Sequence, residues 1–205
     1  MNSPIKLKHL VLATMTLGAM AASQAQTTAT TTTAAMGAAT AVQRDVNQQG
    51  RIEQGLKSGQ LSTREASKLQ VEESHVDRLQ ARDLKDGHLS SAEKVQLTQA
   101  QDKVSQDIRA DKTNAEKGNP ASASSQRLLA DTQRNVNQQS RIEQGLNSGS
   151  LTPHEAGTLE RGQARVSRRE ARAGADGHIS AREQRRIQRT ENHQSRRIHR
   201  QKHDA

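Results

Sequence analysis

The chain is an internal duplication. Residues 44–115 align with residues 134–205 at a constant offset of 90 positions, without a gap. About 30 of the 72 aligned positions are identical, and the longest shared stretch, interrupted only where Gly50 aligns with Ser140, runs from Val46 to Leu56 and again from Val136 to Leu146. Self-similarity of this kind predicts two copies of one structural unit. Any fold for the chain must therefore be built twice from one pattern.

Each copy carries the same boundary signal twice. It consists of a Gly, any residue, an aliphatic residue, a Ser or Thr, and a Glu three places on. It starts at Gly59, Gly87, Gly149 and Gly177. Gly readily adopts the left-handed conformation that ends many helices, and Ser or Thr followed by Glu forms a capping box at the next helix start. The signal therefore predicts four points at which one helix ends and another begins.

These boundaries predict an all-α fold of two tandem three-helix units with short Gly-containing turns. The expected helices cover residues 42–57, 62–84 and 90–114 in the first copy, and 127–147, 152–173 and 180–202 in the second. The chain has no Phe, Tyr or Trp and is only 31% hydrophobic. Aromatic side chains bury the most area, so we expect a thin aliphatic core. Units this small are only marginally stable on their own, so we expect the two copies to pack against each other or the chain to form a homodimer.

The segments outside the copies have different compositions. Residues 1–25 combine a charged start, a short apolar run and small residues near a cleavage point, as in a secretory signal peptide. Residues 26–41 form a Thr/Ala-rich tract that we interpret as a disordered leader, and residues 116–126 form a Gly- and Pro-containing linker. Helical repeat 1 then spans 42–115, and the basic repeat 2 spans 127–205. The expected location is periplasmic or secreted.

The second signal of each copy resembles the end of an EF-hand calcium loop. Asp86 with Glu93, and Asp176 with Glu183, match the Asp-Gly and terminal Glu of that motif. The first ligand place, however, holds Arg82 in one loop and Arg172 in the other, and calcium needs six or more oxygen ligands. A capped turn explains the same residues without a metal. The mature chain also resembles a loosely defined group of uncharacterised exported bacterial helical-repeat proteins with such degenerate EF-hand-like loops, which implies no particular activity.

The two copies differ in charge. Residues 44–115 contain 12 Lys and Arg against 12 Asp and Glu, whereas residues 134–205 contain 15 Lys and Arg against 8 Asp and Glu. Most of this excess is Arg at helical spacing in the last two helices. We expect the following residues to form an anion-binding face: Arg182, Arg186, Arg189, Arg196, Arg200, Arg165 and Arg169. The alternative is an ordinary solvated face. Possible ligands are an anionic surface or a protein partner. Nucleic acid is disfavoured because no aromatic side chain could stack on bases.

Divalent-metal binding is the second functional hypothesis. His199 and His203 are four residues apart, a spacing that brings two ligands to one helix face. The degenerate loops add Asp86, Glu93, Asp176 and Glu183 as further candidate ligands. The competing interpretation is that the histidines are surface residues and that the acids cap helices.

Enzyme motifs are not apparent in the sequence. It has no Cys nucleophile, no Gly-x-Ser-x-Gly elbow and no Gly-rich phosphate loop. We therefore expect a non-enzymatic protein without a cofactor. The first hypothesis is an interaction or binding module with its contact surface in repeat 2.

Overall fold

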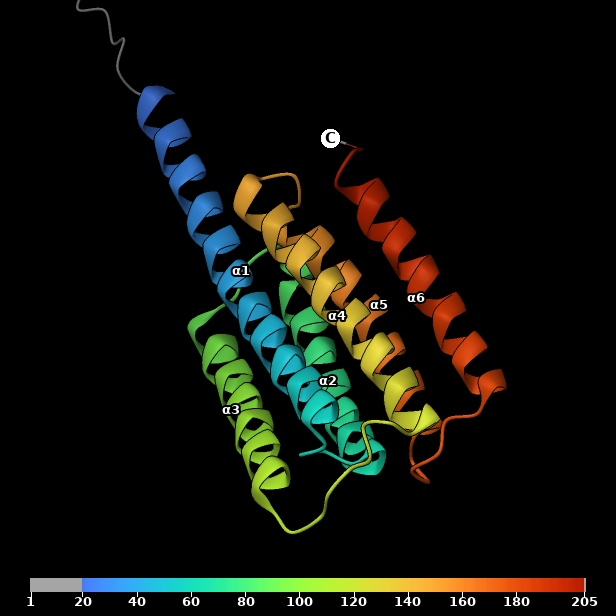
Figure 1. Cartoon of the computed structure of the whole chain (residues 1–205). Helices are drawn as coiled ribbons and strands as arrows, with labels where there is room; N and C mark the ends of the chain where they lie inside the picture. Colours follow the sequence, from blue (N-terminus) through green and yellow to red (C-terminus); the bar gives the residue numbers. More distant parts are fainter. Residues whose placement is uncertain (1–19, 205) are drawn as a thin grey trace, which may run out of the picture. The chain divides into compact units, whose positions relative to one another are not determined.

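The structure is a computed structural model that describes residues 20–204. Within this range it contains six α-helices, one short 3-10 helix and no strand, which confirms the predicted all-α class (Figure 1). The helices are α1 (Met20–Ser58), α2 (Thr63–Asp83), η1 (Leu84–Asp86), α3 (Ser91–Thr113), α4 (Ala123–Ser148), α5 (Pro153–Ala173) and α6 (Ala181–Gln201).

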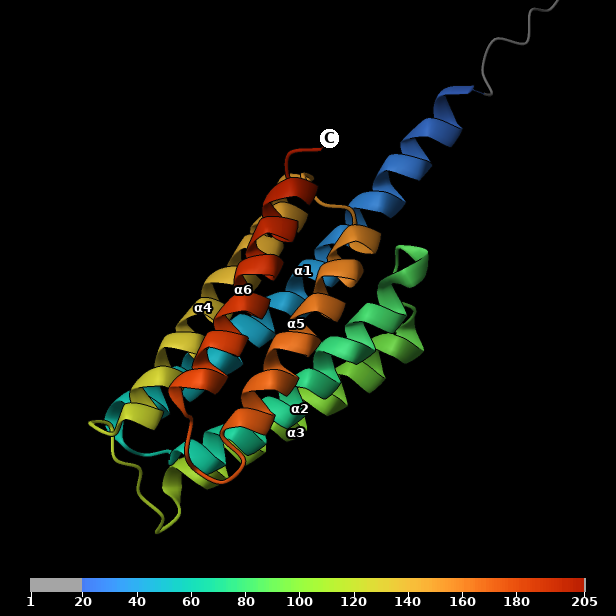
Figure 2. The same cartoon turned by 90° about the vertical axis from the view of Figure 1, so that its right-hand side faces the viewer.

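The chain divides into two compact units, Met1–Thr32 and Thr33–Ala205. The second unit contains both sequence copies, with α2 and α5, the middle helices of the copies, packed against each other. In this unit α3 flanks α2, and α6 flanks α5 (Figures 1 and 2). The two copies therefore share one helical bundle.

The boundary signals form the predicted turns and caps. Their four glycines all have positive φ, between 73° and 88°. Capping boxes start α2, α3, α5 and α6. In each, the Ser or Thr side chain accepts a hydrogen bond from the backbone N–H of the Glu three residues on, and the Glu carboxylate accepts one from the backbone N–H of the Ser or Thr. The aliphatic residue before each cap is buried: Leu61, Leu89, Leu151 and Ile179. Each turn thus stops one helix, starts the next and anchors itself in the core.

The first helix of each copy starts earlier than expected, so the described part of the predicted disordered leader is helical, as are the last residues of the predicted linker, whereas residues 114–122 form a non-helical connection. Helix α1 runs through residues 33–41, where Ala38 is fully buried. Ala combines high helix propensity with a small side chain, so an Ala-rich stretch both extends the helix and packs closely. Helix α4 starts at Ala123, with Ser122 as its cap. The segment before it is held by the Gly118 N–H, which donates to the Gly59 carbonyl at 2.9 Å.

The copies meet through a reciprocal contact in which Ser67 of α2 lies close to Gly174, the C-cap of α5, and Gly157 of α5 lies close to Leu84 of η1. A Cβ added at Gly174 would lie 2.0 Å from Ser67 Oγ, and one added at Gly157 would lie 2.9 Å from Leu84 Cβ. Positions 67 and 157, and positions 84 and 174, correspond in the alignment. Each copy therefore presents the same two positions to the other, as in an isologous dimer interface. Small residues let the helices approach closely without aromatic side chains.

The core of the bundle is aliphatic, and its largest fully buried side chains come from both copies. They are Ile52, Leu56, Leu61, Leu69, Leu84, Ile108, Leu128, Ile142, Leu151, Leu159, Ile179 and Ile187. Between them lies an unusually large set of buried amides and carboxylates, which includes Asp45, Glu73, Glu160 and Glu170. Buried polar groups are costly unless they have hydrogen-bond or charge partners.

Candidate functional site

Arginine side chains of α5 and α6 line an open cleft of about 480 Å³ in the second copy. The lining residues are Arg165, Arg168, Arg169, Arg172, Ala173, Glu183, Arg186 and Thr190. The α5 arginines follow helical spacing, so they project from one side of that helix. Arg186 faces them from α6 across the cleft. The arrangement concentrates five guanidinium groups around one cavity.

Glu183 is the one acidic residue that lines this cleft. Its carboxylate is held by the α6 capping box, where Oε2 accepts from the Ser180 N–H at 2.9 Å and from the Ser180 hydroxyl at 2.6 Å. These hydrogen bonds lower the pKa of Glu183, so the side chain is negatively charged at neutral pH. The capping box thus fixes the position of this charge, and none of the cleft arginines forms an ion pair with it.

The cleft arginines have no acidic partners within residues 20–204. In the second copy the ion pair that the structure forms is Arg134 with Glu191, which belongs to the buried network described below. Burial and the neighbouring charges of Arg165, Arg200 and Arg161 lower the pKa of Arg197. Like charges are therefore crowded along α5 and α6, and an anion would relieve their mutual repulsion.

The predicted anion-binding residues fall into two groups. Arg165, Arg169 and Arg186 line the cleft. The other four lie exposed elsewhere on α6 and do not line it: Arg182, Arg189, Arg196 and Arg200. Arg168 and Arg172 complete the lining, although neither was among the seven residues predicted for the face. Their spacing of three and seven residues from Arg165 was the available signal.

The first copy has a cleft at the corresponding place between α2 and α3. Its volume is about 570 Å³, and Val71, Val76 and Leu79 are among its lining residues. His75, Leu79 and Gln96 stand where the second copy has Arg165, Arg169 and Arg186. The fold therefore supplies the same depression twice, and only the second is strongly cationic.

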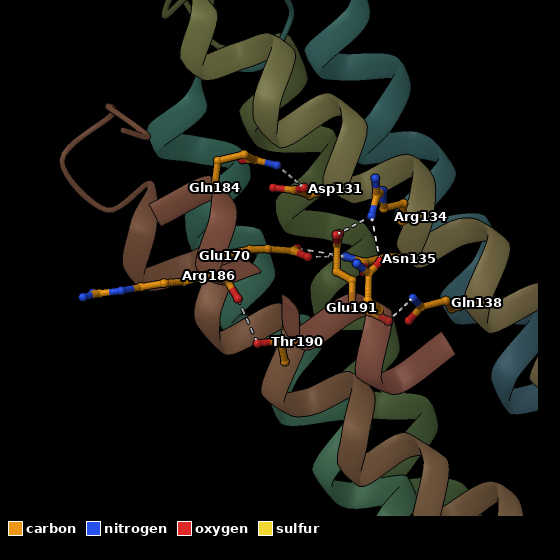
Figure 3. Close-up of polar contacts among 10 residues, drawn as sticks. Asp131, Arg134, Asn135, Gln138, Glu170, Gln184, Arg186, Thr190 and Glu191 are labelled. Atoms are coloured by element: carbon orange, nitrogen blue, oxygen red, sulfur yellow. Dashed lines mark hydrogen bonds and ion pairs between the residues drawn. The ribbon is translucent and has the colours of Figure 1, made fainter. Parts of the chain in front are cut away.

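A buried polar network lies between α4, α5 and α6 (Figure 3). Asn135 Nδ2 donates to both oxygens of Glu170, at 3.1 and 2.8 Å. Gln184 donates to Asp131 at 2.6 Å, and Arg134 donates to Glu191 at 3.2 Å. Figure 3 shows Arg186 extending away from this network. The network packs α4 against the two helices that form the cleft.

Burial raises the pKa of every carboxyl group in this network. It raises the pKa of Asp131 to about 7 and that of Glu191 to about 8, and the Asp131 charge adds to the effect at Glu191. The pKa of Glu170 lies well above its usual range because of burial and the charges of Asp131 and Glu191. These groups therefore hold protons at pH values where exposed carboxylates are ionised.

The two copies exchange acids and amides within their networks. In the first copy Gln80 and Gln101 donate to Asp45. In the second copy Asn135 stands at the place of Asp45 and Glu170 at the place of Gln80, and Glu170 accepts hydrogen bonds from Asn135. The acid therefore lies on the first helix of the first copy but on the middle helix of the second copy. Each arrangement supplies a donor and an acceptor. The buried hydrogen bond is thus retained although its residues differ.

The residues of the metal hypothesis do not form a three-ligand group in the described part of the chain. The His199 and His203 rings lie 4.2 Å apart, and His203 Nδ1 is bonded to the His199 carbonyl at 2.7 Å. Glu93 and Glu183 act in capping boxes. The Asp86 carboxylate accepts a hydrogen bond from the His88 N–H at 3.2 Å, and the Asp176 carboxylate accepts one from the His178 N–H at 2.8 Å.

Comparison of the chain with protein-family models, curated proteins and solved structures found no match. Among the described residues, no helix has the length and apolar character needed to cross a membrane.

Proposed function

We propose that the chain is an exported, non-enzymatic binding module that holds anionic groups in the arginine-lined cleft between α5 and α6. The observation that carries this proposal is the convergence of five arginines on one cavity of about 480 Å³ without acidic partners. Guanidinium groups form bidentate hydrogen bonds with phosphate and carboxylate. An anionic surface or protein partner with such groups is the matching ligand class.

Export is the second part of this proposal. It is supported by the order of charged, apolar and small residues over 1–25. Residues 1–19 of this segment lie outside the described residues, and residues 20–25 begin α1. Beyond the cell membrane, the phosphate groups of lipids and cell-surface polymers provide ligands of the proposed kind. The resemblance to exported helical-repeat proteins points in the same direction.

The direct test is binding of the full-length mature chain to vesicles that contain an anionic phospholipid. The cleft variant is Arg165→His/Arg169→Leu/Arg186→Gln, in which each new residue is the one that the first copy already carries at that place. We expect its affinity at low salt to fall by about tenfold or more. Wild-type binding should weaken as salt is added and should be absent on vesicles of neutral lipid.

The matched control removes three charges from α6 outside the cleft. It is Arg182→Ala/Arg189→Gln/Arg196→Gln, which also uses the residues of the first copy. We expect a clearly smaller loss of affinity than in the cleft variant. An equal loss in both variants would mean that a diffuse cationic face binds the vesicles, and absence of wild-type binding would reject the function.

A further inference from the structure

Three buried carboxylates from three helices converge inside the bundle. They are Asp45 of α1, Asp77 of α2 and Glu160 of α5, and none is more than 2% exposed. Each offers an oxygen that lies within 4.8 Å of the oxygens of the other two. Oxygens bound to one Ca²⁺ lie about 2.3–2.6 Å from it, so two of them are at most about 5 Å apart. The spacing is therefore short enough for one cation to contact all three carboxylates.

A fourth carboxylate, Glu73, belongs to the same buried face. It precedes Asp77 by one helical turn and is 1% exposed, and neither of its carboxylate oxygens has a hydrogen-bond partner. Glu160 Oε1 also has none. Burial raises the pKa of Glu73, and the charges of Asp45 and Glu160 add to this effect. An unpartnered carboxylate in a dry interior is costly unless a proton or a cation accompanies it.

The four positions are neutral at the corresponding places of the other copy. Asp45 corresponds to Asn135, Glu73 to Gln163, Asp77 to Ser167 and Glu160 to Gln70. These neutral residues are buried in the same bundle. Packing of the fold is therefore compatible with an amide or hydroxyl at each position. The divergence of the copies has instead brought three carboxylates within reach of one another, with Glu73 one helical turn from Asp77.

We propose that this cluster is a divalent-cation site in which Asp45, Asp77 and Glu160 are ligands and Glu73 supplies a fourth carboxylate. An all-oxygen set of this kind suits hard cations, namely Mg²⁺, Ca²⁺ or Mn²⁺. It is separate from His199, His203 and the capped loops.

Neighbouring donors orient the proposed ligands. Gln139 Nε2 donates to Asp77 at 3.4 Å and to Glu160 at 3.1 Å. Ser167 donates to the other oxygen of Asp77 at 3.2 Å. Outer hydrogen bonds of this kind fix the direction of metal-binding carboxylates. Since the ligands come from α1, α2 and α5, a bound cation would also join the two sequence copies.

The experiment uses Mn²⁺ as the probe and the full mature chain. Because the cluster is buried, the protein is refolded from denaturant with Mn²⁺ present, and free and bound Mn²⁺ are then separated by dialysis and counted by electron paramagnetic resonance. We expect saturable binding and a higher Tm with Mn²⁺ than with chelator. Ca²⁺ and Mg²⁺ should compete for the same site.

Asp77→Ser introduces the residue that the second copy has at position 167, and Glu160→Gln introduces the residue that the first copy has at position 70. Each variant should abolish saturable Mn²⁺ binding. Glu170→Gln, which introduces the residue that the first copy has at position 80, is the control because it changes a buried carboxylate outside the cluster. It should bind Mn²⁺ as the wild type does. Far-UV circular dichroism checks that each variant is helical.

Glu73→Gln distinguishes a cation site from a core of protonated carboxyl groups. In chelator this variant should have a higher Tm than the wild type, because it removes an unpartnered buried acid. With Mn²⁺ the order should reverse, because the wild type, with its fourth carboxylate, gains more stability from the cation than a variant that keeps only Asp45, Asp77 and Glu160. A wild-type Tm that does not respond to Mn²⁺, or saturable binding that persists in folded Asp77→Ser, would overturn the proposal.

Discussion

Glu183 combines two roles at a single residue, since it caps α6 and places a negative charge in the arginine-lined cleft. Its carboxylate accepts two hydrogen bonds from Ser180. Glutamine also serves at this position of a capping box. We therefore predict that Glu183→Gln leaves α6 intact and strengthens binding to anionic vesicles several-fold at low salt, because the cleft loses its one acidic side chain.

The measurement is vesicle sedimentation at two salt concentrations, with Tm as the check on the cap. The matched control is Glu93→Gln, which makes the same change in the α3 capping box of the first copy. Vesicle affinity should be nearly unchanged in that variant. A similar gain in both variants would show that net charge alone governs binding, and the cleft would lose its special role.

At the scale of elements, the connection between the copies depends on a glycine that is packed against the preceding turn. A Cβ added at Gly118 would lie 2.1 Å from the Leu61 carbonyl oxygen, which belongs to the backbone and cannot rotate away. We predict that Gly118→Ala destabilises the protein by about 1–3 kcal/mol, the usual range for overpacking. The change in the free energy of unfolding is measured by urea denaturation.

Gly50→Ala is the control for this substitution. Gly50 lies within α1, and a Cβ there would meet nothing within 4 Å. Because Ala is the better helix former, Gly50→Ala should stabilise the protein by about 0.5–1 kcal/mol. If Gly118→Ala proved neutral, the connection would not be docked on the α1–α2 turn as described.

Local signals predicted the elements better than their assembly. The turn at Gly177 could be predicted because its positive φ and the Ser180 capping box depend on residues close in sequence. The contact of Gly157 with Leu84 could not, since it depends on how two distant helices meet. Arginine spacing indicated the cationic side of α5. The cleft itself could not be predicted, because it also depends on where α6 packs beside α5.

The buried carboxylates were missed for a related reason. An acid such as Glu160 lies at a helical position that, in sequence alone, is indistinguishable from a solvated one. Its burial follows from the docking of α5 on α2, which hides one face of each helix between the copies. The exchange of Gln70 for Glu160 and of Gln163 for Glu73 between the copies was visible in the alignment. It acquires a meaning only once these positions are known to be interior.

The molecule as a whole carries an excess of buried acids, and this sets the direction of its pH dependence. Burial raises the pKa of Asp45 and Asp131 to about 7 and that of Glu191 to about 8, and places the pKa values of Glu73 and Glu160 well above their usual range. Each group binds its proton more tightly in the folded chain than in the unfolded one. The resulting stabilisation is complete below the unfolded pKa, near 4, and is lost as the pH rises through the folded pKa.

We therefore predict that, with chelator present, the protein is more stable at pH 5 than at pH 8, and that stability falls from about pH 4, where the unfolded carboxyl groups ionise, until the pH passes the folded pKa of each group. The free energy of unfolding is measured by urea denaturation at each pH in this range. Enough salt is added to screen the surface charges that change as histidines titrate. Glu170→Gln should make the decline shallower, because the pKa of Glu170 is raised by burial and by Asp131 and Glu191. Stability that instead increased steadily from pH 5 to pH 8 would mean that these carboxyl groups are ionised and solvated in the folded protein, and the interior described for both copies would be wrong.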